Sequence, residues 1–141
     1  MIGLNVAYLS NSGWHHRDFG PWPWRAEEVR AYRDREAPAR SLVEYLNAAH
    51  PGEPVLFLAS GQTAGLRAPA FVHSWHQYPF HSRALACRDG KDWARLAGEL
   101  GILWVVGNVD GGYAAAEAEF LRDRAEAILT VGDLRLFAIT R

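Results

Sequence analysis

The stretch DGKDWARLAGELGILWVV, residues 89–106, decides the fold class because it joins a helix directly to a buried strand. Asp89 can cap a helix, and Gly101 can end it in the left-handed conformation that favours glycine. The apolar face of this helix has four side chains at helical spacing, Trp93, Leu96, Ala97 and Leu100. The apolar run of residues 102–106 is typical of a strand covered on both faces. A helix followed at once by such a strand is the repeating unit of an α/β protein.

The chain before this stretch repeats the pattern. Residues 25–36 carry charges of both signs and predict a solvated helix. Pro38 suits the first turn of a second helix, which the Pro-Gly pair at residues 51–52 would end. The predicted apolar face of that helix comprises Leu42, Val43, Leu46 and Ala49. Because residues 55–59 predict another buried strand, this part adds a second helix–strand unit.

The chain after it continues with a loop, a helix and a hairpin. A loop is predicted at residues 107–112. The packed face of the following helix is predicted to comprise Ala114, Ala118, Leu121 and Ala125. The Gly-Asp pair at residues 132–133 suits a type II′ turn between strands at residues 127–131 and 134–140. The chain is therefore expected to close with a β-hairpin.

Together these segments predict a single α/β domain over residues 1–141, with a central, mostly parallel sheet, flanking helices and a C-terminal β-hairpin. Hydrophobic residues make up 49% of the chain and charged residues 22%, which is a globular and not a disordered composition. Residues 1–24 are expected to be a lead-in that is irregular where Trp, Pro and Gly dominate. Its apolar run, residues 2–9, predicts at most a strand, because it is too short to span a bilayer and lacks a signal peptide's basic flank.

Charge and cysteine content limit the function classes. The net charge of -1 gives no long-range attraction for nucleic acid, so no nucleic-acid partner is expected. Cys87 is the single cysteine, which excludes an intrachain disulfide. Arg83 and Arg88 could lower the pKa of its thiol, although a lone cysteine without a family signature around it is more often inert. The sequence predicts no complete catalytic set, no metal and no cofactor.

Residues 54–88 contain no carboxylate. They show no steady period beyond residue 66, and a short helix or strand is expected near residues 70–75. Basic side chains interleaved with aromatic ones could hold an anionic ligand, such as a phosphate with an attached lipid or sugar, or lie at a membrane interface. Chance clustering is the alternative. The candidate binding residues in this stretch are Arg67, His73, Trp75, His76, Tyr78, His81, Arg83 and Arg88.

The histidines of this stretch allow another interpretation. His73 and His76 could bind a metal ion, with His81 or a remote aspartate completing the ligands. The stretch lacks the strong helical signature, in which two histidines four residues apart have a glutamate between them. Amphipathic surface or interface histidines are therefore preferred to a metal site.

Two polar loops follow the predicted buried strands. Residues 60–65, SGQTAG, lack the Gly-Lys-Ser/Thr ending of a phosphate-binding loop and the spacing of the dinucleotide fingerprint, so a structural turn is preferred. Residues 107–112 follow the other strand. If the two strands are parallel neighbours, both loops emerge at the sheet edge where open α/β sheets bind ligands. The candidate binding residues at this edge are Ser60, Gln62, Thr63, Asn108 and Asp110.

The chain from about residue 41 to its end resembles the soluble C-terminal region of a membrane-enzyme family. The resemblance rests on three stretches in order, SLVEYLNAAHPGEPVLFL (41–58), DWARLAGELGILWVV (92–106) and FLRDRAEAILTVGDLRLFAI (120–139). The family comprises polytopic lipid-linked-sugar glycosyltransferases of the dolichyl-phosphate-mannose–protein mannosyltransferase type. In it, the region follows the last transmembrane helix and lies outside the cytoplasm. The family's catalytic acidic residues lie in an early loop of the membrane part, and no residue here matches them.

The resemblance implies an accessory extracytoplasmic domain of a membrane glycosyltransferase that uses a polyprenyl-phosphate sugar donor. Such a domain would help to position donor or acceptor. Its partners would be the membrane-embedded portion of the same polypeptide and a lipid-linked sugar phosphate. Whether the chain takes part in an enzyme stays open at this point. The alternative is a stand-alone α/β module or small enzyme that binds a nucleotide or sugar phosphate at the two strand-end loops.

Overall fold

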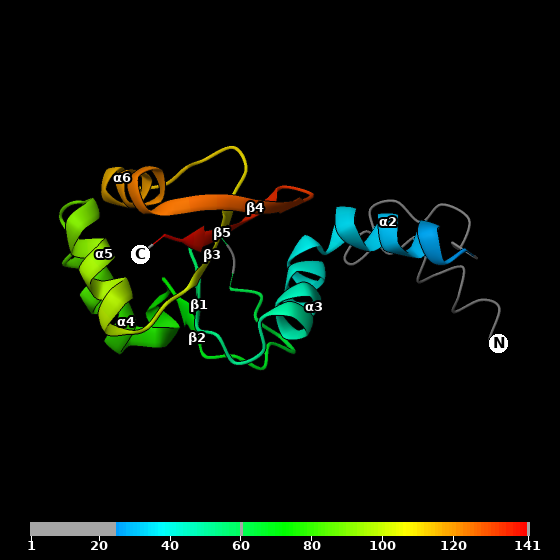
Figure 1. Cartoon of the computed structure of the whole chain (residues 1–141), viewed down its shortest axis with the longest axis horizontal. Coiled ribbons are helices and arrows are strands. Elements are labelled where there is room, and N and C mark those ends of the chain that lie inside the picture. The colour runs from blue at the N-terminus through cyan, green and yellow to red at the C-terminus, as the bar shows by residue number, and fades with distance from the viewer. Residues whose placement is uncertain (1–24, 60, 141) are drawn as a thin grey trace, which may run out of the picture. The chain divides into compact units, whose positions relative to one another are not determined.

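The computed structural model of the chain describes residues 25–59 and 61–140 (Figure 1). Its contacts divide the chain into two units, residues 1–32 and 33–141, and the boundary falls within α2 (Ala26–Glu36). No residue of α2 is buried. The solvated helix predicted here is therefore confirmed.

The predictions for the N-terminal 24 residues, a strand and then an irregular segment, lie outside the described residues. A single domain over the whole chain also stays a prediction.

The second unit is built on a five-stranded sheet with the order β2-β1-β3-β5-β4. The strands are β1 (Val55–Phe57), β2 (Ala70–Val72), β3 (Trp104–Asn108), β4 (Ala125–Val131) and β5 (Leu134–Ile139). β1 pairs in parallel with both β2 and β3, whereas β5 pairs antiparallel with β3 and β4. This mixed sheet confirms the predicted α/β class and the C-terminal hairpin.

Helices cover both faces of the sheet (Figure 1). The side chains of β1 alternate between the two faces, as the two-residue period of a strand requires. Val55 and Phe57 belong to the core cluster beneath α3, whereas Leu56 belongs to the cluster beneath α4, α5 and α6. The unit therefore has three layers, with one core on each side of the sheet. The helices are α3 (Pro38–Ala49), α4 (Tyr78–Leu85), α5 (Gly90–Glu99) and α6 (Ala115–Arg124).

The predicted helix ends and the predicted turn are confirmed by their geometry. Asp89 caps α5, because its Oδ1 accepts a hydrogen bond from the backbone N–H of Asp92 at 2.8 Å. Gly101 ends the helix at φ +64°. Gly132 has φ +57° and Asp133 has no positive φ, which is the type II′ and not the type I′ combination. A Cβ on Gly132 would lie 2.7 Å from the carbonyl oxygen of Asp34, so the turn requires glycine.

Three predicted boundaries or faces were wrong. β3 begins at Trp104 and includes Gly107 and Asn108, so it is shifted by two residues relative to the prediction. The buried face of α6 comprises Glu117, Phe120 and Leu121, and the side chains of Ala114 and Ala118 are exposed. In α3, Ala39 is buried and Ala49 is exposed. For the two helices the reason is that alanine is a weak marker of a buried face, whereas one Phe or Leu fixes the orientation of a helix.

The stretch without a steady period forms β2, a short 3-10 helix η1 (Trp75–Gln77) and then α4. Gln77 covers the free edge of β2. Its Oε1 accepts from the backbone N–H of Val72 at 2.9 Å, and its Nε2 donates to the carbonyl oxygen of Ala70 at 3.1 Å. The side-chain amide thus takes the place of a neighbouring strand's peptide group. The unpaired edge of a sheet can pair with a strand of another chain. The contact of Gln77 blocks such pairing at β2.

The variant Gln77→Ala is expected to lower the free energy of unfolding by about 1–3 kcal/mol, because two backbone groups of β2 lose their partners. Urea unfolding followed by circular dichroism measures this change. The control is Ser82→Ala, an exposed position where the hydroxyl only bonds the carbonyl of Pro79. This control is expected to change the free energy of unfolding by less than about 0.5 kcal/mol. Equal stability of the two variants would contradict the role assigned to Gln77.

Candidate functional site

The carboxyl ends of β1 and β3 lie at one edge of the sheet, because the two strands are parallel neighbours. Beyond them, Gln62 and Asn108 line a single cleft of about 610 Å³ on the side of α3. The predicted loops after β1 and β3 therefore meet at this cleft. Thr63 and Asp110 do not line the cleft, and Ser60 lies outside the described residues.

The charge of this cleft does not favour a phosphate. Its lining includes two carboxylates, Glu36 and Asp133, and one guanidinium, Arg35. Arg35 pairs with Glu36 at 2.6 Å, which leaves Asp133 as the unbalanced charge. Amides and carboxylates suit the hydroxyl groups of an uncharged polar ligand better than they suit an anion. The cleft could thus accept a sugar more readily than a nucleotide.

A buried polar cluster lies on the other side of the sheet. His73 follows β2 directly, and its Nδ1 lies 3.0 Å from Oε1 of Glu117 on α6. The second oxygen of Glu117 accepts from the backbone N–H of Ala114 at 3.0 Å and so caps α6. Glu117 is only 8% exposed. The rings of His81 and Trp93 lie 5.0 and 5.9 Å from the ring of His73, so the cluster joins β2, α4, α5 and α6.

The two histidines of this cluster each bury one ring nitrogen. Nε2 of His73 and Nδ1 of His81 are buried and have no hydrogen-bond partner, so a substrate cannot reach them as they stand. His76 does not join them, because its ring is tilted against the ring of Trp75, with the ring centres 3.7 Å apart. Within residues 25–59 and 61–140, no group of three His, Cys, Asp or Glu side chains is arranged to hold a metal ion. The metal interpretation of the histidines therefore has no geometry to support it in this part of the chain.

Three large apolar side chains point outward from η1 and α4. Trp75 is 71% exposed, Tyr78 70% and Leu85 66%. Tyr78 and Leu85 are seven residues apart in α4, with the exposed Ser82 between them, so they share one face of the helix. We call Trp75, Tyr78 and Leu85 the η1–α4 surface. Tyr78 and Leu85 therefore share an exposed apolar face of α4, and Trp75 is exposed on the preceding η1.

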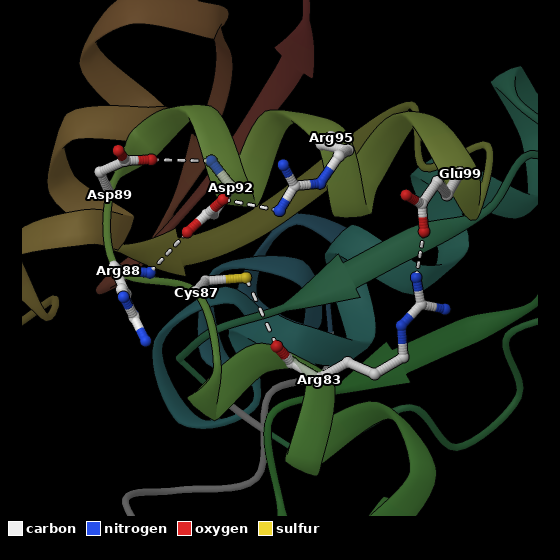
Figure 2. A network of polar contacts seen from close by, with 7 residues as sticks. All are labelled: Arg83, Cys87, Arg88, Asp89, Asp92, Arg95 and Glu99. Atoms are coloured by element: carbon white, nitrogen blue, oxygen red, sulfur yellow. Dashed lines mark hydrogen bonds and ion pairs between the residues drawn. The ribbon is translucent and has the colours of Figure 1, made fainter.

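Arg83 and Arg67 of the same stretch make contacts with α5 and α3. Arg83 pairs with Glu99 of α5 (Figure 2). Arg67 is held beside α3, where its backbone N–H donates to Oδ1 of Asn47 at 2.9 Å. The eight candidates of residues 67–88 are therefore not one site: two histidines face inward, the exposed aromatics face outward, and Arg83 faces α5.

The contacts of α5 with the end of α4 form a network of ion pairs and hydrogen bonds (Figure 2). Asp92 is its centre, since it accepts from the backbone N–H of Arg88 at 3.0 Å and from the guanidinium of Arg95 at 2.6 Å. The hydrogen bond from Arg88 and the charge of Arg95 hold the pKa of Asp92 below its usual value. The guanidinium of Arg88 itself extends away from the carboxylates.

Cys87 lies in this network, and its surroundings raise the pKa of its thiol. Burial raises the pKa of the Cys87 thiol, and the charge of Asp92 raises it further, against a smaller opposing effect of Arg95 and Arg83. Arg83 does lower this pKa, as suggested, but burial and Asp92 outweigh it, and Arg88 is not among the groups that shift it. The sequence showed the two arginines but not the three carboxylates that α5 brings to them, Asp89, Asp92 and Glu99.

Alkylation of Cys87 by iodoacetamide is expected to be slower in the folded chain than in the urea-unfolded chain at neutral pH. The thiolate is the reactive form, and a raised pKa lowers its population. The rate for the folded chain should keep rising with pH after the rate for the unfolded chain has levelled off. The variant Asp92→Asn removes a charge that raises the pKa, so it should react faster than the wild type. Faster alkylation of the folded wild type would contradict the burial argument.

The comparisons with known proteins add no identity. No protein-family model matches the chain, and no curated protein and no solved structure matches it either. In the part of the chain that the structure describes, no helix has both the length and the apolar content needed to cross a membrane.

Two residues important to these sites were missed by sequence reasoning, Glu117 and Gln77. A glutamate at the third position of a helix is a capping signal, and it could have identified Glu117. No sequence signal predicts that Gln77 folds back onto β2.

Proposed function

We propose that this chain is an accessory extracytoplasmic domain of a membrane-embedded glycosyltransferase that uses a polyprenyl-phosphate sugar donor. Its role is to help position the donor or the acceptor. The observation that carries the proposal is the order of the secondary structure. α3 with β1, α5 with β3, and α6 with the β4–β5 hairpin occupy the three stretches on which the resemblance to that family rests. The membrane-embedded portion of the same polypeptide is the proposed main partner.

Two features of the second unit support an accessory role. Its described residues present no exposed nucleophile with an oriented base, since the His73–Glu117 pair is buried. Its largest exposed apolar side chains gather on the η1–α4 surface. A domain that contributes positioning and not chemistry needs a docking surface of this kind and no catalytic set.

Sugar transfer by the polypeptide that contains these residues tests the proposal. Membranes with the intact polypeptide should transfer sugar from a polyprenyl-phosphate donor. Removal of residues 33–140 should lower kcat/KM by about a hundredfold, as expected when the reactants are misplaced by roughly an ångström. Protease protection must show that both forms are inserted alike. Absence of transfer by the intact polypeptide, or equal transfer by both forms, would contradict the proposal.

The second candidate is a stand-alone module that binds a small polar ligand at the strand-end cleft. The meeting of Gln62 and Asn108 in that cleft favours it. A ligand that binds the folded chain raises its melting temperature, so a panel of sugars, sugar phosphates and nucleotides should reveal the preferred class. The charge of the cleft predicts a larger shift with sugars than with nucleotides. Loss of the shift in Asn108→Ala would locate the ligand, and no shift with any compound would remove this candidate.

A further inference from the structure

The two outer edges of the sheet differ in what covers them. The edge of β2 is covered by the side chain of Gln77. β4 forms the other edge, and α6 covers only its beginning, where the backbone N–H of Ala125 donates to a carbonyl oxygen of that helix. Among the described residues, no hydrogen bond occupies a backbone group on the outer side of β4 beyond this point. Ala127, Ile128 and Thr130 are exposed there. An open edge of this kind can pair with another strand.

The peptide groups that face this open edge are those of Ala127 and Thr130. Ala125 turns its N–H away from β5, and because directions alternate along a strand, Ala127 faces outward as well. Val131 flanks the two-residue turn and faces β5, so Thr130 faces outward. The two outward groups are three residues apart and not two, because Ile128 is the extra residue of a β-bulge.

The three-residue spacing selects the partner of this edge. A regular strand presents edge groups at every second residue, so it can match only one of the two outward groups. A second copy of this chain has the same three-residue spacing. When it runs antiparallel about a two-fold axis, it places Thr130 of each copy opposite Ala127 of the other. The bulge thus disfavours unrelated strands, as bulges at edges do, and leaves self-pairing as the matching geometry.

The charges at the ends of β4 fit the same register. The pairing that matches the peptide groups also sets Asp133 of one copy opposite Arg124 of the other. Both side chains are exposed, and neither has an ion-pair partner among the described residues. The neighbouring carboxylate of Asp123 is balanced by Arg122 at 2.9 Å. Glu126, the one charged residue within β4, faces an apolar residue across the pair, so no like charges lie opposite each other.

We propose that two copies of this chain pair through the open edges of β4, so that their two five-stranded sheets join into one. Ile128 and Leu129 of each copy lie at the centre of the contact, and an ion pair between Arg124 and Asp133 lies at each end. The contact is short, so the dimer dissociates on dilution, as small interfaces do. The inference goes beyond the proposed function and does not depend on it.

Analytical ultracentrifugation of the 141-residue chain tests the pairing. With increasing concentration, the average mass should rise from that of one 15.7 kDa chain toward twice that value. Arg124→Glu and Asp133→Arg each set like charges opposite each other at both ends of the contact, so each should weaken the dimer by about tenfold. The double variant Arg124→Glu/Asp133→Arg restores opposite charges and should dimerise like the wild type.

A second pair of variants tests the strand itself. Ile128→Lys puts two cations near the two-fold axis and should abolish the dimer. The matched control is Leu85→Lys, which places the same charge at a 66% exposed position on α4 and should leave the dimer unchanged. In the wild type, hydrogen exchange should show the backbone amide of Thr130 protected only at concentrations at which the dimer forms.

Circular dichroism of each variant must show the wild-type spectrum, so that weaker association reports the edge of β4 and not unfolding. A wild-type chain that stays monomeric at every concentration would overturn the proposal, and so would exchange of the Thr130 amide that does not depend on concentration. Recovery that fails in the double charge variant would overturn it as well. Equal loss of association in Leu85→Lys and Ile128→Lys would place the contact elsewhere and contradict the pairing through β4.

Discussion

Replacement of Trp93 by alanine is expected to lower the free energy of unfolding by about 3–5 kcal/mol, the usual cost of removing a buried aromatic side chain. Trp93 is 2% exposed and lies on α5. Its ring stacks on Phe120 of α6 at 6.2 Å and meets the edges of Phe80 at 6.4 Å and His73 at 5.9 Å. One side chain therefore connects α5 to α4, to α6 and to the end of β2. Chemical unfolding in urea measures the loss.

The chain offers a matched control for this prediction. Trp75→Ala removes the same side chain from a position that is 71% exposed, and it should change the free energy of unfolding by less than about 0.5 kcal/mol. The free energy of unfolding of Trp93→Phe should fall between those of Trp93→Ala and Trp75→Ala, because the smaller phenyl ring fills part of the space that the indole occupies. Similar stability of the two tryptophan-to-alanine variants would contradict the assignment of Trp93 to the core.

Glu117→Ala is expected to cost about 2–4 kcal/mol of unfolding free energy, because it removes two different contacts at once. The backbone N–H of Ala114 loses its cap, and Nδ1 of His73 is left without a partner in a buried setting. The cluster that joins α6 to the end of β2 is then incomplete. Thermal and urea unfolding of the variant should agree on the loss.

Two further variants separate these effects from a simple loss of charge. Glu126→Ala removes an exposed carboxylate from β4 and should leave the free energy of unfolding nearly unchanged. Glu117→Gln keeps an oxygen for the cap and a polar partner for His73, so it should retain more than half of the stability that Glu117→Ala loses. If Glu117→Gln were as unstable as Glu117→Ala, the carboxylate charge and not the hydrogen bonds would hold the cluster.

Much of the fold follows from local sequence rules. Asp89 and Gly101 mark the two ends of α5, and both act by local backbone geometry. Gly132 specifies its turn in the same way, and the apolar runs of β1 and β3 indicate burial on both faces. Such features depend on a few neighbouring residues, which is why an isolated sequence can reveal them.

The remaining features depend on contacts between distant residues. The face of α6 was mispredicted because the three alanines of the predicted face carry little apolar area, whereas Phe120 carries much. The basic stretch up to Arg88 could be found from the sequence, but its division into inward and outward side chains could not. The pairing of Arg83 with Glu99 and the pKa of Cys87 depend on how α5 packs against α4.

The location of the polypeptide tests the central claim most directly. Membranes of cells that make the polypeptide containing these residues would be extracted with alkaline carbonate, and intact cells would be treated with protease. The account predicts that the polypeptide stays in the membrane and that residues 33–140 are cut from the extracytoplasmic side. A polypeptide that is released by carbonate, or whose residues 33–140 can be cut only after the cells are opened, would contradict it.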